Sequence, residues 1–367
     1  MHRRQSRWEC LVRPHLKEAR DLATHIQLAV VCNTRGRTEP QSNYERQSID
    51  SRFYSPSETE FFLGSLRTAG FLVHPFFDER EFIQWVSKGQ HLEVGPRKLL
   101  VISTGASFPG VGSKSLIPAF CRLHGLEIIG PDPHTASLAR HKYHSNLILR
   151  TLGDIAPQSW CYNPSYGWLR NLRPPDGQRV IIKLLHEAAS LGIDQQSITA
   201  VDATLTKRVK EIARDFRQSV MVQEFVSGDE VEVPLLCTPR PHALTSVGIS
   251  IKDLLHLDEQ ILTHTLSQTE AYGFWDFESN ATAKLHMLVC QLAEDCAELI
   301  GLRDLARIDF RIDKSGRPKV IDVSTSPYLN PHSSFAFAAK LAGGSAAELP
   351  VLLVALGAAR LGCARAP

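Results

Sequence analysis

The sequence has almost no net charge. Among its 367 residues, 41 lysines and arginines stand against 39 aspartates and glutamates, which leaves a formal charge of +2 at pH 7. A protein with this balance has no strong overall field that could hold a nucleic-acid backbone or an anionic membrane surface. We therefore expect neither a nucleic-acid nor a membrane partner, and nucleic-acid binding would require a local basic patch.

Paired cysteines and long apolar runs are also missing. The eight cysteines are scattered, and no two of them form a Cys-x-x-Cys pair. In a chain of this size, which needs no disulfides, they are expected to be reduced, buried thiols of a cytoplasmic protein. The longest apolar stretch, residues 349–359, has about half the length needed to span a bilayer, so we predict a core helix there. No apolar stretch of an export signal closely follows the basic N-terminus.

Residues 1–25 are rich in arginine, but acidic residues at Glu9, Glu18 and Asp21 interrupt the positive charge. A nucleic-acid arm and an organelle-targeting helix are two interpretations of such a segment. We prefer a third interpretation, a solvated N-terminal extension.

From residue 26 onward, short β-branched runs alternate with amphipathic stretches, which is typical of an α/β fold with parallel strands and crossover helices. One helix has a clear start, because Ser55 is a good N-cap, Pro56 suits the first turn and Glu58 completes a capping box. The strands predicted for this first domain are 26–32, 71–75, 99–103 and 126–130, and the helices are 56–69, 79–87 and 113–124.

Beyond residue 132 the pattern changes, first to a mixed region and then to antiparallel strands. A hairpin is predicted around the turn 313–316, where Gly316 suits a positive φ. The segment 162–178, which is rich in Pro, Gly, Asn and Arg, is predicted to be a loop. A pair of helices is predicted over 135–151, and further helices over 204–216 and 281–300. The predicted strands are 180–184, 220–226, 230–236, 244–251, 306–312 and 319–323.

Two lysines could hold phosphate groups. Lys183 ends an apolar strand and precedes a loop of small residues that includes Ser190, and Lys142 lies at the start of a helix. A lysine beside such a loop can bind nucleotide phosphates through its charge and through backbone N–H groups. For each lysine on its own, a solvent-facing surface position is the preferred interpretation.

A strand that leads into an acidic turn provides a second candidate. The backbone of residues 224–226 could pair with an adenine edge, which would leave Glu230 to accept ribose hydroxyls. A solvated acidic hairpin is the alternative.

Asp309 and Asp322 form the third candidate. They lie on neighbouring strands of the predicted hairpin, and strand alternation allows both carboxylates to point to one face, together with Arg307. Proteins usually hold Mg²⁺ through one or two carboxylates together with phosphate oxygens. The pair therefore indicates a magnesium–phosphate site.

Taken in order, these features resemble the ATP-grasp superfamily, and most closely the D-alanine–D-alanine ligase family, over residues 26–345. The stretch 130–142, Gly-Pro-Asp-Pro-His-Thr-Ala-Ser-Leu-Ala-Arg-His-Lys, resembles the family's Gly-x-x-x-x-(Ala/Ser)-x-x-x-x-Asp-Lys motif. The stretches 307–311 and 322–333, Arg-Ile-Asp-Phe-Arg and Asp-Val-Ser-Thr-Ser-Pro-Tyr-Leu-Asn-Pro-His-Ser, resemble its Arg-x-Asp and Glu-x-Asn-Thr-x-Pro-Gly-x-Thr-x-x-Ser motifs. The resemblance implies an α/β ATP-grasp fold.

In that fold, an N-terminal parallel α/β domain (26–132) follows the extension (1–25) and precedes two α+β subdomains (133–226 and 227–367) that clasp ATP. Arg307 is expected to face the reacting carboxyl group. By resemblance, the nucleotide-binding residues are Lys142, Lys183, Glu187, Gln223, Glu224, Phe225, Val226 and Glu230. The metal-binding residues are Asp309, Asp322 and Ser324, the catalytic residues are Arg307, Ser190 and Tyr328, and the substrate-binding residues are Glu58 and Ser333.

Several positions depart from the family pattern. Asp322 replaces a longer glutamate, and Ser324 replaces an asparagine that helps to hold a second magnesium ion. Tyr328 stands where the family has a glycine, in the segment that lines the acceptor pocket. Residues 256–280 are shorter than the family's lid. These departures indicate a specialised relative.

The resemblance implies ATP and one or two Mg²⁺ ions as cofactors, small-molecule carboxylate and amine substrates, and it allows a homodimer. The first hypothesis is an ATP-dependent carboxylate–amine ligase for amino-acid-like substrates, which works through an acylphosphate. The alternatives are the housekeeping D-alanine–D-alanine ligase and a nucleotide-binding pseudoenzyme.

Overall fold

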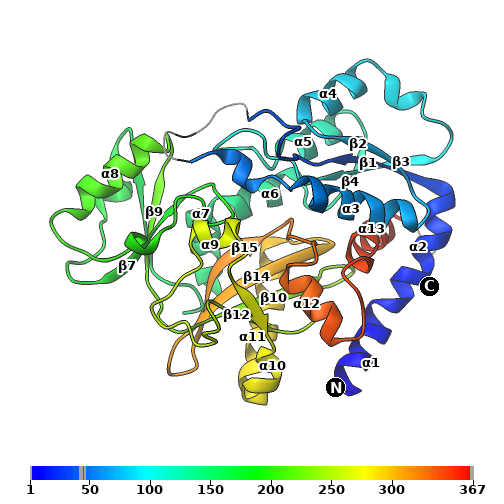
Figure 1. Cartoon of the computed structure of the whole chain (residues 1–367). Coiled ribbons are helices and arrows are strands. Elements are labelled where there is room, and N and C mark those ends of the chain that lie inside the picture. The colour runs from blue at the N-terminus through cyan, green and yellow to red at the C-terminus, as the bar shows by residue number, and fades with distance from the viewer. Residues whose placement is uncertain (1, 41–43, 45–46, 364–367) are drawn as a thin grey trace.

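The computed structural model of the protein describes residues 2–40, 44 and 47–363. Within these residues, consecutive parts of the chain build a four-stranded, a five-stranded and a six-stranded sheet. Helices cover the outer faces of the sheets, and the N-terminal and C-terminal helices lie side by side at one end of the molecule (Figure 1).

The four-stranded sheet is parallel, as the alternating pattern predicted. Along its central strand, Leu28 and Val30 belong to the core on one face, whereas Ala29 and Val31 belong to the core on the other. Because both faces are covered by helices, the strand is apolar throughout. Across the sheet the strands are β2 (Leu72–Phe76), β1 (Ile26–Val31), β3 (Lys98–Ser103) and β4 (Glu127–Ile129). The covering helices are α2 (Arg13–His25), α3 (Pro56–Thr68) and α13 (Glu348–Arg360) on one face, and α4 (Glu79–Ser87) and α5 (Leu116–Leu123) on the other.

The predicted capping box is present at the start of α3. The Ser55 side chain accepts a hydrogen bond from the Glu58 amide, and the Glu58 carboxylate accepts one from the Ser55 amide. Pro56 occupies the first turn. The predicted start of this helix is therefore confirmed.

The interpretation of residues 1–25 as a solvated extension is wrong. Met1 lies outside the described residues, but residues 2–25 form α1 (His2–Leu11) and α2, and Trp8 and Val12 are 1% and 0% exposed. Trp8, Val12, Ala19 and Leu22 contribute to the same hydrophobic core as α13. The predicted core helix at 349–359 is confirmed as α13, which packs against α2 and the first sheet.

The five-stranded sheet is antiparallel, and its residues alternate between a core and a cavity. Val180, Ile182 and Val222 pack beneath α8 (Leu205–Asp215), whereas Lys183 and Gln223 point to the opposite face. The predicted loop at 162–178 is partly wrong, because residues 159–168 form a hairpin. Across the sheet the strands are β6 (Gly167–Trp168), β5 (Ser159–Asn163), β9 (Val220–Glu224), β7 (Arg179–Leu184) and β8 (Ile198–Ala200).

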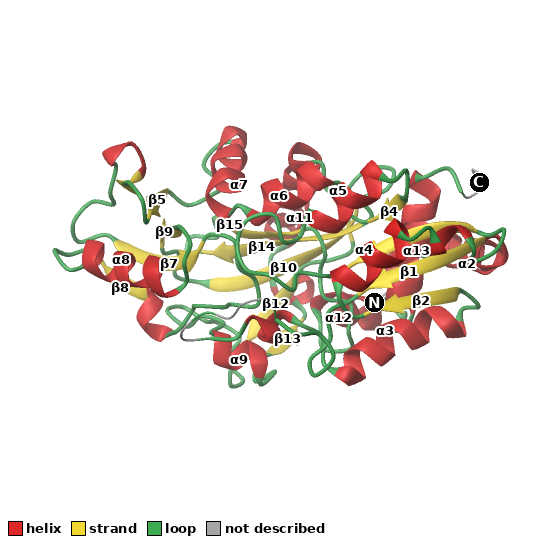
Figure 2. Ribbon diagram, turned by 90° about the horizontal axis from the view of Figure 1, so that it is seen from above, coloured by secondary structure: helices red, strands yellow, loops and turns green. Residues whose placement is uncertain are grey.

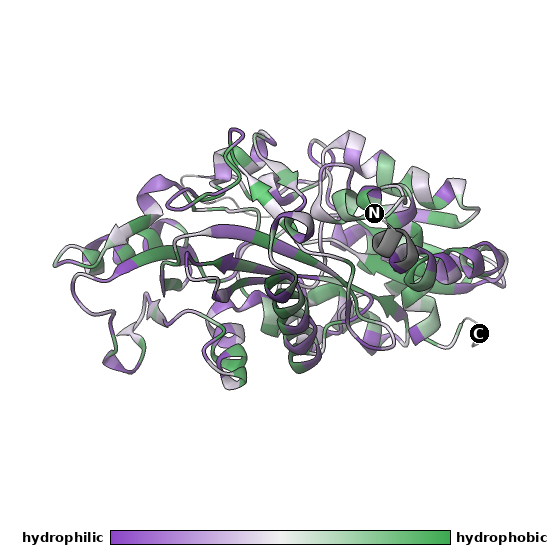
Figure 3. Ribbon diagram, turned by 90° about the horizontal axis from the view of Figure 1, so that it is seen from below, coloured by the Kyte–Doolittle hydropathy of each residue, from purple (hydrophilic) through white to green (hydrophobic). Residues whose placement is uncertain are grey.

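The six-stranded sheet lies between the other two (Figure 2). Val231, Ile308 and Phe310 pack beneath α11 (Ala283–Ile300), and the residues between them point to the other face. Figure 3 shows this alternation of hydrophobic and hydrophilic residues along the long central strands. Across the sheet the strands are β13 (Gly273–Trp275), β12 (Val247–Ser250), β10 (Asp229–Leu236), β14 (Leu305–Ile312) and β15 (Pro318–Ser324), and β11 (His242–Ala243) pairs with β10.

The predicted hairpin turn is confirmed, since Gly316 has a φ of +77° and its amide donates to the Asp313 carbonyl at 2.8 Å. The remaining helices are α6 (Pro133–Arg140), α7 (Lys142–Leu149), α9 (His264–Gln268), α10 (Phe277–Asn280) and α12 (Ser334–Leu341). The 3-10 helices are Ile49–Arg52, Gln90–Leu92, Arg150–Leu152, Leu169–Asn171 and Gln195–Ser197.

The expectation for the cysteines holds for most of them. All eight are free thiols; five are buried, but Cys10 is exposed. In the part of the chain that the structure describes, no helix has the length and apolar character needed to cross a bilayer.

Candidate active site

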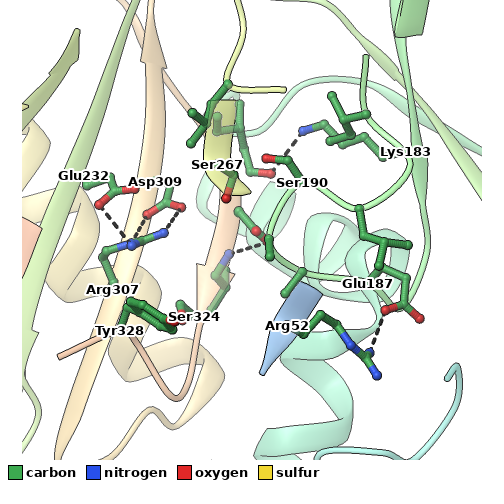
Figure 4. Close-up of a pocket in the computed structure, with 18 of the residues that line it drawn as sticks. Arg52, Lys183, Glu187, Ser190, Glu232, Ser267, Arg307, Asp309, Ser324 and Tyr328 are labelled. Carbon is green, nitrogen blue, oxygen red and sulfur yellow. Dashed lines mark hydrogen bonds and ion pairs between the residues drawn. The ribbon is translucent and has the colours of Figure 1, made fainter. Parts of the chain in front are cut away.

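A cavity of about 340 Å³ lies where the three sheets meet. Its walls come from the polar faces of β7, β9, β10, β14 and β15 and from loops of the first domain. Figure 4 shows that charged side chains project into it from several elements. All the residues that the family resemblance assigned to catalysis, nucleotide, metal or substrate line this cavity, namely Glu58, Lys142, Lys183, Glu187, Ser190, Gln223, Glu224, Phe225, Val226, Glu230, Arg307, Asp309, Asp322, Ser324, Tyr328 and Ser333.

Asp309 and Asp322 lie directly opposite each other in the β14–β15 pairing. Arg307 is two residues before Asp309, so strand alternation places its guanidinium group on the same face. Its Nε and Nη2 atoms donate to the two oxygens of Asp309 at 2.7 and 2.8 Å. The Nζ atom of Lys142 donates to Asp322 at 2.6 Å. Each carboxylate of the pair is therefore balanced by a cation from the protein.

The pKa values of these two carboxyl groups shift in opposite directions. Burial and the neighbouring charge of Asp322 raise the pKa of Asp309, although Arg307 opposes the change. Burial also disfavours the ionised form of Asp322, but Lys142 and Lys183 outweigh it and lower the pKa. Asp322 is thus the better ionised of the pair.

Glu232 also belongs to this cluster, and the sequence analysis missed it. Its carboxylate is 3.0 Å from Nη1 of Arg307, so Arg307 lies between Glu232 and Asp309 (Figure 4). The residue is only 5% exposed, and burial raises its pKa to about 8, while Arg307 acts in the opposite direction. Its position two residues after Glu230, on a predicted strand, was the signal that could have revealed it.

Lys183 is buried on β7. Its Nζ atom donates to the Gln223 side chain at 3.0 Å and to the Ile321 carbonyl at 3.4 Å. Neither acceptor carries a charge. Burial and the nearby Lys142 lower the pKa of Lys183 to about 8, although Asp322 and Glu230 raise it.

The segment after β9 presents fewer free backbone groups than expected. The amides of Glu224 and Phe225 already donate to the carbonyls of Gln158 and Arg179. Arg311, which the sequence analysis did not assign, organises this region. It donates to the carbonyls of Val226, Asp258 and Gln260 at 3.1, 2.5 and 3.0 Å. It also forms an ion pair of 3.3 Å with Glu230.

Two residues of the small-residue loop after β7 have different surroundings. Ser190 lines the cavity with a φ of +52°. Glu187, by contrast, is bonded to the protein: Arg52 and the hydroxyl of Tyr44 both lie 2.6 Å from its carboxylate oxygens. These bonds leave little of its hydrogen-bonding capacity for a ligand.

The residues expected to bind substrate, Glu58 and Ser333, already form hydrogen bonds within the protein. Glu58 closes the capping box, and Ser333 caps α12 by accepting from the Ala336 amide at 3.1 Å while it donates to the Asn330 carbonyl at 2.7 Å. Tyr328 contacts Tyr54 edge to face, with ring centroids 4.9 Å apart. Its ring therefore lies along the wall of the cavity nearest the first domain.

A metal ion in this cavity would need oxygen atoms of a substrate, in addition to protein side chains, to complete its coordination. Among the residues that the structure describes, no three His, Cys, Asp or Glu side chains form a group that could hold a metal. The paired Asp309 and Asp322 nevertheless fit the usual Mg²⁺ arrangement, in which one or two carboxylates are joined by phosphate oxygens.

Comparison with known proteins agrees with this architecture. The family model "D-ala D-ala ligase C-terminus" matches residues 167–355, just over half of the chain. The protein y4sG of Sinorhizobium fredii, described as uncharacterized, is 27% identical over 237 residues, which are 64% of this chain and 67% of that protein. The D-alanine–D-alanine ligase of Albidiferax ferrireducens is 28% identical over 236 residues, which are 64% of this chain and 65% of that ligase. These alignments thus span about two thirds of each relative's length.

Solved structures share the fold. The D-alanine–D-alanine ligase of Bacillus anthracis, complexed with ATP, superposes with a TM-score of 0.65 and 14% identity over 91% of this chain and 98% of that one. The VanG D-Ala:D-Ser ligase of Enterococcus faecalis gives a TM-score of 0.64 and 15% identity over 91% and 99%. The ATP-grasp fold is thereby confirmed, and the chain belongs to the D-alanine–D-alanine ligase-like family of ATP-grasp ligases, which form carbon–nitrogen bonds.

Proposed function

We propose that the protein is an ATP-dependent ligase that joins a carboxylate to an amine on amino-acid-like small molecules and releases ADP and phosphate. One observation carries the proposal: Lys142, Lys183, Arg307, Asp309 and Asp322 converge on one cavity from four separate elements. The ATP complex of the structurally similar Bacillus anthracis ligase supports a nucleotide in this cavity.

The proposed reaction has two steps. A substrate carboxylate oxygen attacks the terminal phosphorus of ATP, which forms an acylphosphate and releases ADP. An amine then attacks the acyl carbon, the amide forms, and phosphate leaves with the electrons of the broken C–O bond. Such chemistry depends on positioning and on charge neutralisation. It needs no covalent nucleophile from the protein.

The residues of the cavity divide these tasks. We assign Lys142 and Lys183 to the neutralisation of phosphate charge, and Glu230, which is paired with Arg311, to the ribose hydroxyls. Arg307 donates two hydrogen bonds beside the carboxylate pair, so it is suited to stabilise charge that develops on the reacting carboxyl group. Asp309 and Asp322 would hold Mg²⁺, which when bound neutralises charge on the phosphate oxygens.

A nucleotide-binding pseudoenzyme is a second candidate. It is favoured by the ion pairs that already engage both proposed metal ligands, Lys142 with Asp322 and Arg307 with Asp309. Measurement of turnover distinguishes the ligase from the pseudoenzyme. We infer a cytoplasmic location from the free cysteines, and we infer small-molecule substrates from the size of the cavity, about 340 Å³.

The test is to incubate the full-length protein with Mg·ATP and a panel of D- and L-amino acids and small carboxylates. ADP and the mass of the amide product are measured. We expect at least one pair of substrates to yield both. In that reaction, Asp309→Asn and Asp322→Asn should each lower the rate by about 100-fold or more, since carboxylates of this kind act on developing phosphoryl charge.

A matched control is Asp176→Asn, which alters an exposed aspartate outside the cavity and should keep the parental rate. Nucleotide binding without turnover on any substrate would favour the pseudoenzyme. Failure to bind either ATP or ADP would contradict both candidates.

A further inference from the structure

The cavity is unevenly charged. At the hairpin end, the carboxylates of Glu230, Glu232, Asp309 and Asp322 all form ion pairs with cations. At the end next to the first domain, Arg35 is paired with Glu58, and three further cations line the wall, namely Arg52, Lys114 and Arg140. We refer to these three residues as the basic cluster.

Arg140, the last residue of α6, lacks the partners that a shielded guanidinium group normally has. Its Nε and Nη2 atoms are inaccessible to solvent, and neither donates a hydrogen bond to any residue that the structure describes. Glu187, one of the two carboxylates whose charge acts on Arg140, already binds Arg52 and Tyr44. A charge that is removed from water without a partner is costly, and a bound anion would offset that cost.

Lys114 adds to the excess of positive charge. Its Nζ atom donates to the Thr104 carbonyl at 2.7 Å, and it forms no ion pair within the described part of the chain. Burial, followed by the repulsion of Arg140 and Arg52, lowers its pKa to about 7. Among the residues that the structure describes, Arg52 alone of these three cations forms an ion pair, with Glu187 (Figure 4).

The position of the cluster relates it to the reacting groups. Arg140 lies two residues before Lys142, which is bonded to Asp322. Both residues line the same cavity. A molecule that occupies the cavity with one carboxylate near Arg307 and Asp322 can therefore extend a second anionic group toward Arg140.

We propose that the basic cluster is an anion subsite, centred on Arg140, that binds a second carboxylate of the substrate, so the preferred substrate is an acidic one such as a dicarboxylic amino acid. This inference rests on the proposed ligase function and deepens it. Guanidinium groups bind carboxylates through two parallel hydrogen bonds. Arg140 lines the cavity and has two unpaired donors, Nε and Nη2, and because both are shielded from solvent, its guanidinium group must turn toward the cavity to bind a carboxylate.

The experiment compares acids with their neutral amides. D- and L-glutamate, D- and L-aspartate and succinate are titrated calorimetrically into the full-length protein that is saturated with Mg²⁺ and a non-hydrolysable ATP analogue. The matched neutral probes are D- and L-glutamine, D- and L-asparagine and succinamate. We expect at least one acid to bind about tenfold or more tightly than its amide, as for a charge-assisted hydrogen bond.

Arg140→Met should abolish that preference, and Arg140→Lys should retain part of it, because the charge remains but the paired donors do not. The control is Arg122→Met, which removes an exposed charge of α5 outside the cavity and should change nothing. Thermal unfolding of each variant confirms that the fold is intact.

Two results would overturn the inference. One is equal affinity of the parent protein for every acid and its amide, in which case ligase turnover on neutral amino acids would still uphold the proposed function. The other is an Arg140→Met variant that loses affinity for ATP but not for ADP or for the acids. That outcome would assign the cluster to the terminal phosphate of the nucleotide.

Discussion

Lys183 carries its ammonium group in a site that disfavours charge. It is buried, its two acceptors are neutral, and its pKa is lowered from 10.5 to about 8. Because the pKa of Lys183 is lower in the folded state, the folded protein binds fewer protons than the unfolded chain between about pH 8 and 10.5. The contribution of Lys183 to the free energy of unfolding therefore falls as the pH drops through that range. A bound phosphate would favour the charged form and raise the pKa again.

Nucleotide binding should therefore take up a proton above pH 8, and ADP affinity should fall as the pH rises through that value. Calorimetric titration with ADP at pH 8.5, in two buffers that differ in ionisation enthalpy, measures the proton directly. Lys183→Met should abolish the uptake, whereas Lys207→Met, on the exposed side of α8, should preserve it. An ADP affinity that stays constant between pH 7 and 9.5 would argue against a phosphate contact by Lys183.

Tyr328 lines the part of the cavity that the family resemblance assigns to the acceptor amine. Its ring contacts Tyr54 at the wall formed by the first domain, and burial, with Tyr54 and Glu58 nearby, raises its pKa. It therefore remains a neutral hydroxyl that can donate a hydrogen bond. A ring in this position narrows the space that a small acceptor would use.

We expect the parent protein to dimerise D-alanine poorly. Tyr328→Gly should change the preference among acceptor amines while nucleotide affinity stays within about twofold, and Tyr328→Phe should keep the parental preference if the ring alone sets it. Rates of amide formation over a panel of amino acids provide the measurement. Efficient synthesis of D-alanyl-D-alanine by the unmodified protein would instead support the housekeeping activity.

Among the elements, α1 and α2 depart furthest from what their composition indicated. Trp8 packs so closely that a Cβ atom added at Gly344 would lie 2.3 Å from its ring. Trp8→Ala should cost about 3–5 kcal/mol of unfolding free energy, as large aromatic truncations in cores do. Urea unfolding measures this loss, and Glu9→Ala, at an exposed ion pair, should remain within about 0.5 kcal/mol of the parent. A Trp8→Ala variant as stable as the parent would mean that these helices are dispensable.

Elements with strong local signals could be predicted from the sequence. The Ser55 capping box, the Gly316 turn and the apolar strand at residues 26–31 depend on neighbours within a few residues, and all three are present. The pairing of Asp309 with Asp322 followed from strand alternation in a single hairpin. Local physical rules were sufficient for these features.

Contacts between distant segments could not be predicted in this way. Arg140 meets Arg52 and Lys114 only because α6 packs beside the first domain, and no local pattern marks these three residues as neighbours. The helices at residues 2–25 were obscured by their arginines, since only a narrow apolar face is buried. The short elements α9 and β13 gave too little periodicity to detect, yet Ser267 and Tyr272, which belong to that region, line the cavity.

At the scale of the whole molecule, the cavity exists only because all three sheets contribute to it. Thr104 from the first domain, Gln223 from β9 and Asp322 from β15 lie on different walls. The C-terminal helix α13 returns to the first sheet, so both ends of the described chain stabilise the same domain. The proposed site is thereby held between elements that are far apart in the sequence, which suits a reaction that depends on positioning.

The most direct test of the proposed reaction follows an oxygen atom. The carboxylate substrate found in the panel is labelled with ¹⁸O in both oxygens and turned over with Mg·ATP and the amine, and the phosphate is analysed by mass spectrometry. If the carboxylate attacks the terminal phosphorus, one ¹⁸O must leave in each phosphate and the other must stay in the amide. Label in AMP, or unlabelled phosphate alongside the amide product, would contradict activation of the carboxylate as an acylphosphate in this cavity.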